Sequence, residues 1–155
     1  MWNKEEKQKA YELLISQQKE LIKDEHNWLA TLSNASALLN MTLPDTVFAG
    51  FYLFDENELV LGPFQGNVSC TRIQMGKGVC GEAAAENKTV IVENVKEHKN
   101  YIACDSAALS EIVVPMIKED RLIGVLDIDS QKVNSYDQTD QKYLEDYCEQ
   151  LLQVF

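Results

Sequence analysis

The chain has 155 residues, 45% hydrophobic and 25% charged, which is the composition of a folded domain with its own core. Its formal net charge of −11 disfavours binding to nucleic-acid phosphates or to anionic membrane surfaces, because both need clustered Lys and Arg. No apolar run approaches the roughly 20 residues of a membrane span, and the N-terminus has no apolar signal core. We therefore expect a single-domain cytoplasmic protein.

Two N-terminal segments have the apolar spacing of amphipathic helices. The first spans Lys4–Lys23, where leucines recur at helical intervals among Lys, Glu and Gln. Asp24 is the predicted N-cap of the second, which runs to about Leu39, and Pro44 then closes the helical region.

The middle of the chain alternates short apolar runs with turns. It is predicted to form the strands Thr46–Phe54, Glu58–Leu61, Cys70–Met75, Thr89–Val95, Glu111–Lys118 and Arg121–Ser130. Gly62–Gly66 interrupts the second strand, and an alanine-rich helix is predicted over Val79–Glu86. Asp137 caps a closing helix. Helices at both ends of a run of strands predict an α+β fold, an α/β sandwich around an antiparallel sheet of about six strands.

Three acids stand in apolar surroundings near the C-terminal end of the predicted sheet. Asp127 and Asp129 are spaced i, i+2, so both project from the same face of a strand. Glu111 opens the preceding strand. Burying a charge costs free energy unless a partner compensates it, so we expect a bound ligand to supply that partner. The alternative is that these acids are the solvated ends of edge strands.

The register of the last two strands decides whether the three acids meet. With a simple two-residue turn, Glu111 would lie opposite Ile128 and would face away from Asp127 and Asp129. A shift of one residue moves it to the other face. We therefore predict a β-bulge near Pro115, an odd-length loop, or Glu111 reaching in from before the paired region.

The four cysteines have different surroundings. Cys148 lies on the apolar stripe of the last helix and reads as a small buried hydrophobe. Cys80 either packs at the start of its helix or is a thiol activated by the helix dipole. Cys70 suits a core strand, whereas Cys104 lies next to an aspartate in the long polar segment 96–110, which favours a reactive role. No CxxC motif occurs, which gives little support for a zinc site.

Six motifs occur in a characteristic order along the chain. They are GPFQG (62–66), SC (69–70), GKGVCGEA (76–83), IACD (102–105), SEIVVP (110–115) and GVLDIDS (124–130). With them the chain resembles the free methionine-(R)-sulfoxide reductases, which are stand-alone GAF-domain enzymes. The resemblance runs from Asn27 to the last helix and implies one GAF-like domain over residues 1–155.

The resemblance implies roles for individual residues. Cys104 resembles the nucleophile, Cys70 the resolving thiol, and Cys80 the third family cysteine. The implied substrate-binding residues are Glu111, Asp127, Asp129, Phe48 and Tyr52. Two positions depart from the family pattern: Phe48 stands where a tryptophan is usual, and Tyr101 replaces a histidine.

The implied reaction is thiol-dependent reduction of free L-methionine (R)-sulfoxide through a cysteine sulfenic acid and an intramolecular disulfide. Glu111 or Asp129 would supply a proton, and Asp127 would bind the substrate ammonium. The expected partners are this substrate and a thioredoxin-like reductant, with a homodimer as a further option, and no metal or organic cofactor is needed. The alternatives are a ligand-sensing GAF regulatory domain and a cysteine redox sensor.

Overall fold

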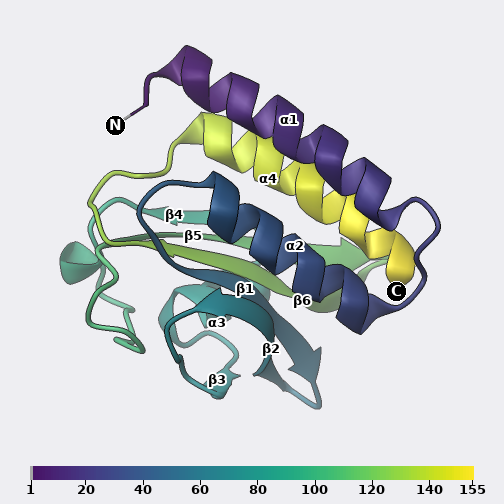
Figure 1. The fold of residues 1–155 in the computed structure, drawn as a ribbon. Coiled ribbons are helices and arrows are strands. Elements are labelled where there is room, and N and C mark those ends of the chain that lie inside the picture. Colours follow the sequence, from purple (N-terminus) through teal and green to yellow (C-terminus); the bar gives the residue numbers. More distant parts are fainter. Residues whose placement is uncertain (1) are drawn as a thin grey trace.

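A computed structural model describes residues 2–155 and confirms the predicted α+β class (Figure 1). The strands are β1 (Thr46–Asp55), β2 (Glu58–Gly66), β3 (Arg72–Gln74), β4 (Val90–Val92), β5 (Ser110–Lys118) and β6 (Arg121–Ser130). The helices are α1 (Lys4–Ile22), α2 (Trp28–Thr42), α3 (Gly78–Glu86) and α4 (Gln138–Leu151), with short 3-10 turns η1 (Val95–Glu97) and η2 (Leu152–Val154). All six strands join one antiparallel sheet in the order β3-β2-β1-β6-β5-β4.

The sheet has a different helical cover on each face (Figure 1). Helices α2 and α4 pack on one face, and α1 lies against both of them as an outer layer. Helix α3 covers the other face, against β5 and β6. The strands alternate between the two cores: Phe51 and Leu126 face α2 and α4, whereas Tyr52 and Val125 face α3. Within residues 2–155, no helix is long and apolar enough to cross a membrane.

Two sequence-based boundaries were wrong. Asn27, not Asp24, caps α2, because its side chain accepts a hydrogen bond from the Ala30 N–H, while residues 23–27 form the connection between the helices. Gly62–Gly66 does not interrupt the second strand, since β2 continues to Gly66. A bulge there leaves two residues of β2 opposite one of β1 and accommodates the proline that cannot donate a ladder hydrogen bond.

Two other predicted strands are shorter than expected. Strand β3 covers only Arg72–Gln74, so Cys70 lies in the loop before it rather than in a core strand. Strand β4 ends at Val92, and Val95 begins a 3-10 turn instead. Both differences leave more irregular chain around the cysteines than the sequence indicated.

The β5–β6 hairpin contains the β-bulge predicted near Pro115. Ile117 pairs with Leu122, but Met116 pairs with Gly124, so Ile123 is the extra residue of β6. The shift places Glu111 opposite Asp129. A two-residue turn still joins the strands, because both of its residues adopt positive φ. The bulge therefore brings the three acids to one face of the sheet.

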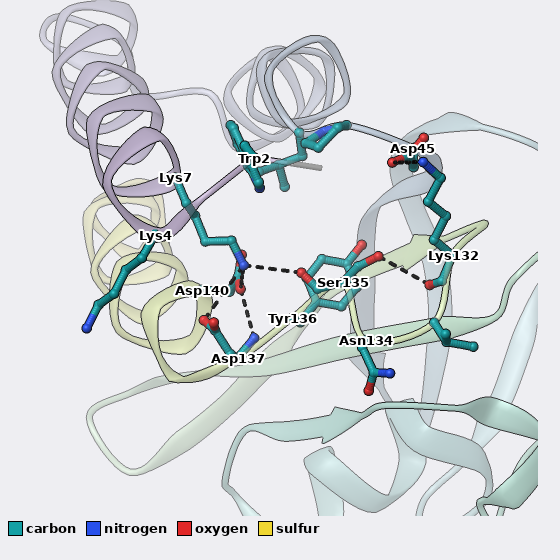
Figure 2. Close-up of a pocket in the computed structure, with 13 residues that line it drawn as sticks. Trp2, Lys4, Lys7, Asp45, Lys132, Asn134, Ser135, Tyr136, Asp137 and Asp140 are labelled. Carbon is teal, nitrogen blue, oxygen red and sulfur yellow. Dashed lines mark hydrogen bonds and ion pairs between the residues drawn. The ribbon is translucent and has the colours of Figure 1, made fainter.

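A cavity of about 180 Å³ lies where α1, α4 and the segment before α4 meet (Figure 2). Lys7 reaches from α1 across it, and its Nζ donates to Asp140 Oδ2 at 2.6 Å and to the Ser135 carbonyl at 3.3 Å. The Tyr11 hydroxyl donates to Asp140 Oδ1 at 2.6 Å. These contacts tie the first helix to the last, on the face of the sheet that does not carry the cysteine loops.

Candidate active site

A disulfide joins Cys70 to Cys104 on the α3 side of the sheet, with their Cα atoms 5.3 Å apart. Cys70 comes from the loop between β2 and β3, and Cys104 from the loop between η1 and β5. A second link joins these loops, since the Asn67 side-chain amide donates to Asp105 Oδ2 at 2.9 Å. The sequence separation across the bond is 34 residues, so it holds two distant loops together.

Tyr52 on β1 holds the Cys70 loop in place. Its hydroxyl donates to the Cys70 carbonyl at 2.8 Å and lies 2.9 Å from Ser69 Oγ, from which it can accept. Burial raises the pKa of the Tyr52 phenol, so it remains a neutral donor. Phe48 lies behind Tyr52, with their rings stacked at 6.2 Å, and does not line the pocket.

Glu111, Asp127 and Asp129 form a buried acid cluster beneath the two cysteine loops. Their exposed fractions are 6%, 3% and 8%. Asp127 Oδ1 and Asp129 Oδ1 have no hydrogen-bond partner. Among residues 2–155, no Lys, Arg or His forms an ion pair with any of the three. The cluster therefore lacks the internal cation that buried carboxylates normally require.

Burial is the main cause that raises the pKa of all three carboxyls. Repulsion from Asp127 adds to this rise at both Glu111 and Asp129. Hydrogen bonds from its neighbours oppose the rise at Asp127, so its pKa is raised less strongly. At neutral pH the cluster can therefore hold protons to donate, with Asp127 the member that ionises most readily.

Cys80 lies against the acid cluster from the first turn of α3, as a free and buried thiol. Burial, together with the charges of Asp127 and Glu111, raises its pKa well above the usual value. Of the two hypotheses for Cys80, this environment favours packing at the start of the helix over activation by the helix dipole. Ligand atoms of Cys80, Glu111 and Asp127 lie within 4.8 Å of one another and could hold a metal ion, which would have to displace their protons.

The pocket between the disulfide and the acid cluster has a volume of about 30 Å³. Its lining residues are Tyr52, Ser69, Ile73, Gly78, Val79, Cys80, Tyr101, Ile102, Cys104, Asp105, Glu111, Asp127 and Asp129. This volume holds a water or two but not an amino acid. The disulfide form is thus a closed form of the site.

Sequence reasoning missed several residues that shape this pocket. Ser69 and Asn67 position the Cys70 loop, and the Asn100 side chain bonds to the backbone of Gly76 and Gly78. Tyr101 lines the pocket directly. The sequence signals for Tyr101 were its position next to the IACD motif and its replacement of a family histidine, but its place in the pocket lining was not predicted. Cys148, as predicted, lies buried in the opposite core.

Comparison with known proteins agrees with this geometry. The sequence model of the GAF domain matches residues 30–155. A free methionine-R-sulfoxide reductase of Escherichia coli is 46% identical over 86% of this chain and 81% of its own length. A free methionine-R-sulfoxide reductase of Saccharomyces cerevisiae is 43% identical over 90% of this chain and 82% of its own length. The structure of the Neisseria meningitidis enzyme in complex with its substrate superposes with a TM-score of 0.91 at 44% identity, over 95% of this chain and 90% of that one. The chain therefore belongs to the free methionine-R-sulfoxide reductases of the GAF domain family.

Proposed function

We propose that this protein reduces free L-methionine (R)-sulfoxide to methionine with thiols as reductant. The observation that carries the proposal is the disulfide between Cys70 and Cys104 directly above a buried acid cluster without an internal cation. The first feature is the product of a two-thiol reduction, and the second suits a small ammonium-bearing substrate.

In the first step Glu111 or Asp129 protonates the sulfoxide oxygen, and this makes the substrate sulfur electrophilic. The raised pKa of both groups keeps a proton available near neutral pH. The Cys104 thiolate attacks that sulfur, the oxygen passes to Cys104 as a sulfenic acid, and methionine leaves. The substrate thus gains two electrons, which Cys104 loses.

In the second step a resolving thiol attacks Cys104 Sγ, and the sulfenic oxygen leaves as water. The Cys70–Cys104 bond favours Cys70 for this role. Cys80 is assigned to packing against the acids, because its raised pKa leaves little thiolate. The balance is one sulfoxide and two thiols giving methionine, one disulfide and one water.

Substrate recognition is assigned to the remaining site residues. Asp127, the most readily ionised acid, accepts the substrate ammonium. Tyr52, backed by Phe48, provides an aromatic wall. Because the closed pocket is too small for an amino acid, the disulfide is reduced and the loops separate before the next substrate enters. A thioredoxin-like protein as reductant, a cytoplasmic location, a single domain over residues 1–155 and a homodimer remain predictions.

The experiment is an assay of methionine release from each diastereomer of the free sulfoxide with dithiothreitol as reductant. We expect turnover of the (R) form only, and much slower turnover of a sulfoxide within a peptide, whose residue has no free ammonium. Cys104→Ser should abolish turnover, and Cys148→Ser, its matched control in the opposite core, should leave it nearly intact. Full activity of Cys104→Ser would refute the mechanism, whereas ligand binding without turnover in the unmodified protein would favour a sensor.

A further inference from the structure

Exposed apolar side chains border the disulfide on both sides. Val68 lies two residues before Cys70 and is 85% exposed, and Ile102 lies two residues before Cys104 and is 42% exposed. Both cysteines are themselves half-buried. Val68 is the most exposed of the large apolar side chains within residues 2–155. Nothing inside the molecule accounts for its placement beside the redox bond.

The same border differs in charge from the rest of the molecule. The chain carries 25 acids and a formal charge of −11, yet residues 64–78, which include Cys70, contain Arg72 and Lys77 and no acid. Lys99, exposed, lies on the other loop next to Asn100, whose side chain ties that loop to Gly76. Arg72 is ion-paired with Glu58, so Lys77 and Lys99 are the cations that matter on this border. Asp105, next to Cys104, is an acid on the same border and accepts hydrogen bonds from the Asn67 amide and the Ala107 N–H.

We propose that Val68 and Ile102, flanked by Lys77 and Lys99, form the docking rim for a thioredoxin-like protein dithiol. The proposal rests on the proposed function, which leaves a disulfide to be reduced in every cycle. An apolar contact beside the bond would bring the partner's thiol to it, and the lysines favour a partner whose own rim is neutral or acidic. Without these lysines, a molecule with a formal charge of −11 would repel an acidic partner.

The chemistry at this rim is thiol–disulfide exchange. A thiolate of the partner attacks one sulfur of the Cys70–Cys104 bond, forms a mixed disulfide and releases the other cysteine as a thiolate. The second thiol of the partner then attacks the mixed disulfide and releases the remaining cysteine. Two electrons pass to Cys70 and Cys104, which take up two protons overall, and the partner leaves as a disulfide.

The test compares two reductants on matched variants. Val68→Asp is compared with Met41→Asp, which changes an equally apolar side chain, 79% exposed, at the far end of α2. Turnover is measured once with dithiothreitol and once with thioredoxin, thioredoxin reductase and NADPH. We expect Val68→Asp to lower kcat/KM for thioredoxin by about 10-fold or more, and to leave the dithiothreitol rate within about twofold. Met41→Asp should leave both rates unchanged.

Lys77→Glu provides a second variant that does not touch the apolar contact. It should lower the thioredoxin rate at low salt, and added salt should reduce the difference. Equal thioredoxin rates for Val68→Asp and the unmodified protein would overturn the proposal, as would equal losses with both reductants, which would assign Val68 to the loop structure. Efficient reduction by glutathione, unaffected by Val68→Asp, would also overturn it. An unmodified protein that is inactive with dithiothreitol would instead contradict the proposed function.

Discussion

Buried carboxyls occur at two places in this molecule, and they differ in the groups beside them. Asp140, 1% exposed, has the Lys7 ammonium at 2.6 Å (Figure 2). The Tyr11 hydroxyl lies at 2.6 Å from its other carboxylate oxygen. Glu111, Asp127 and Asp129 are almost as buried, but they have only one another and Cys80.

The difference separates a structural carboxylate from functional ones. Burial raises the pKa of Asp140 as well, but the hydrogen bonds from Lys7 and Tyr11 act in the opposite direction and stabilise the charged form. At Glu111 and Asp129 repulsion from Asp127 increases the rise in pKa instead. One site contains its own cation and joins two helices, whereas the other needs a cation or protons from outside.

The largest expected effect comes from the acid cluster of Glu111, Asp127 and Asp129, which has no cation beside it among residues 2–155. Glu111→Gln removes a proton donor, so kcat with dithiothreitol should fall by about 10²- to 10⁴-fold. The free energy of unfolding should stay equal or rise, because a neutral amide replaces a crowded acid. Steady-state kinetics and urea unfolding of the oxidised protein measure the two effects. Comparable losses of activity and stability would erase the distinction between the two sites.

The Lys7–Asp140 pair should respond in the opposite sense, with a loss of stability and no loss of activity. Asp140→Asn leaves the Lys7 ammonium buried without its nearest anion, and we expect a loss of about 3 kcal/mol in the free energy of unfolding. The dithiothreitol-dependent activity should be unchanged at temperatures where the variant is folded. Adding Lys7→Met to Asp140→Asn should lower the free energy of unfolding little further, because the Lys7–Asp140 interaction is already lost. Additive losses in the double variant would contradict a direct pair.

The third prediction concerns pH. The folded-state pKa of Glu111 and Asp129 lies above the value near 4 that carboxyls have in an unfolded chain. Between these values the folded protein holds protons that the unfolded chain has released. The free energy of unfolding should therefore fall as pH rises above about 4, by up to about 1.4 kcal/mol per pH unit for each proton.

Glu111→Gln removes one such group. The free energy of unfolding of this variant should therefore fall less steeply with pH than that of the unmodified protein. Urea unfolding from pH 5 to pH 8, with the disulfide intact, measures both slopes. Parallel slopes would show that Glu111 holds no extra proton in the folded state.

The sequence could predict the acid cluster because strand geometry follows strict rules. Counting the pairs of β5 and β6 alone put Glu111 on the face opposite Asp129, so the expectation that the acids share one site required a shift. The bulge, one of the three predicted alternatives, supplies it. The caps and loops follow weaker rules. Asp and Asn are both common N-cap residues, so the residue type alone does not separate Asp24 from Asn27, which caps α2.

The state of the cysteines could be predicted only in part. The position of Cys104 in a polar loop indicated reactivity, but the burial of Cys80 against three acids depends on how α3 packs over the sheet. That packing joins residues far apart in the chain, and no local pattern records it. The contact between Asn67 and Asp105 could not be predicted for the same reason, because it joins residues far apart in the chain.

The smallest expected effect comes from Lys132, an exposed lysine near the buried Lys7–Asp140 pair. Lys132 lines the same cavity as Lys7, and its Nζ lies 3.4 Å from Asp45 Oδ2, but their side chains are 57% and 28% exposed (Figure 2). Water screens this pair and the exposed lysine loses side-chain entropy when it is held, so Lys132→Met should change the free energy of unfolding by less than about 1 kcal/mol. The difference should disappear at about 1 M salt, where screening is nearly complete.

Lys7→Met is the matched variant, because it removes the same charge from the same cavity but at a buried position. Lys7→Met should lower the free energy of unfolding several times more than Lys132→Met does. Most of that loss should persist at high salt, because the Lys7–Asp140 pair is largely buried. If the two lysines instead proved equal, burial would not be what separates a structural carboxylate from an exposed ion pair. The absence of a buried cation beside Glu111, Asp127 and Asp129 would then no longer point to a ligand.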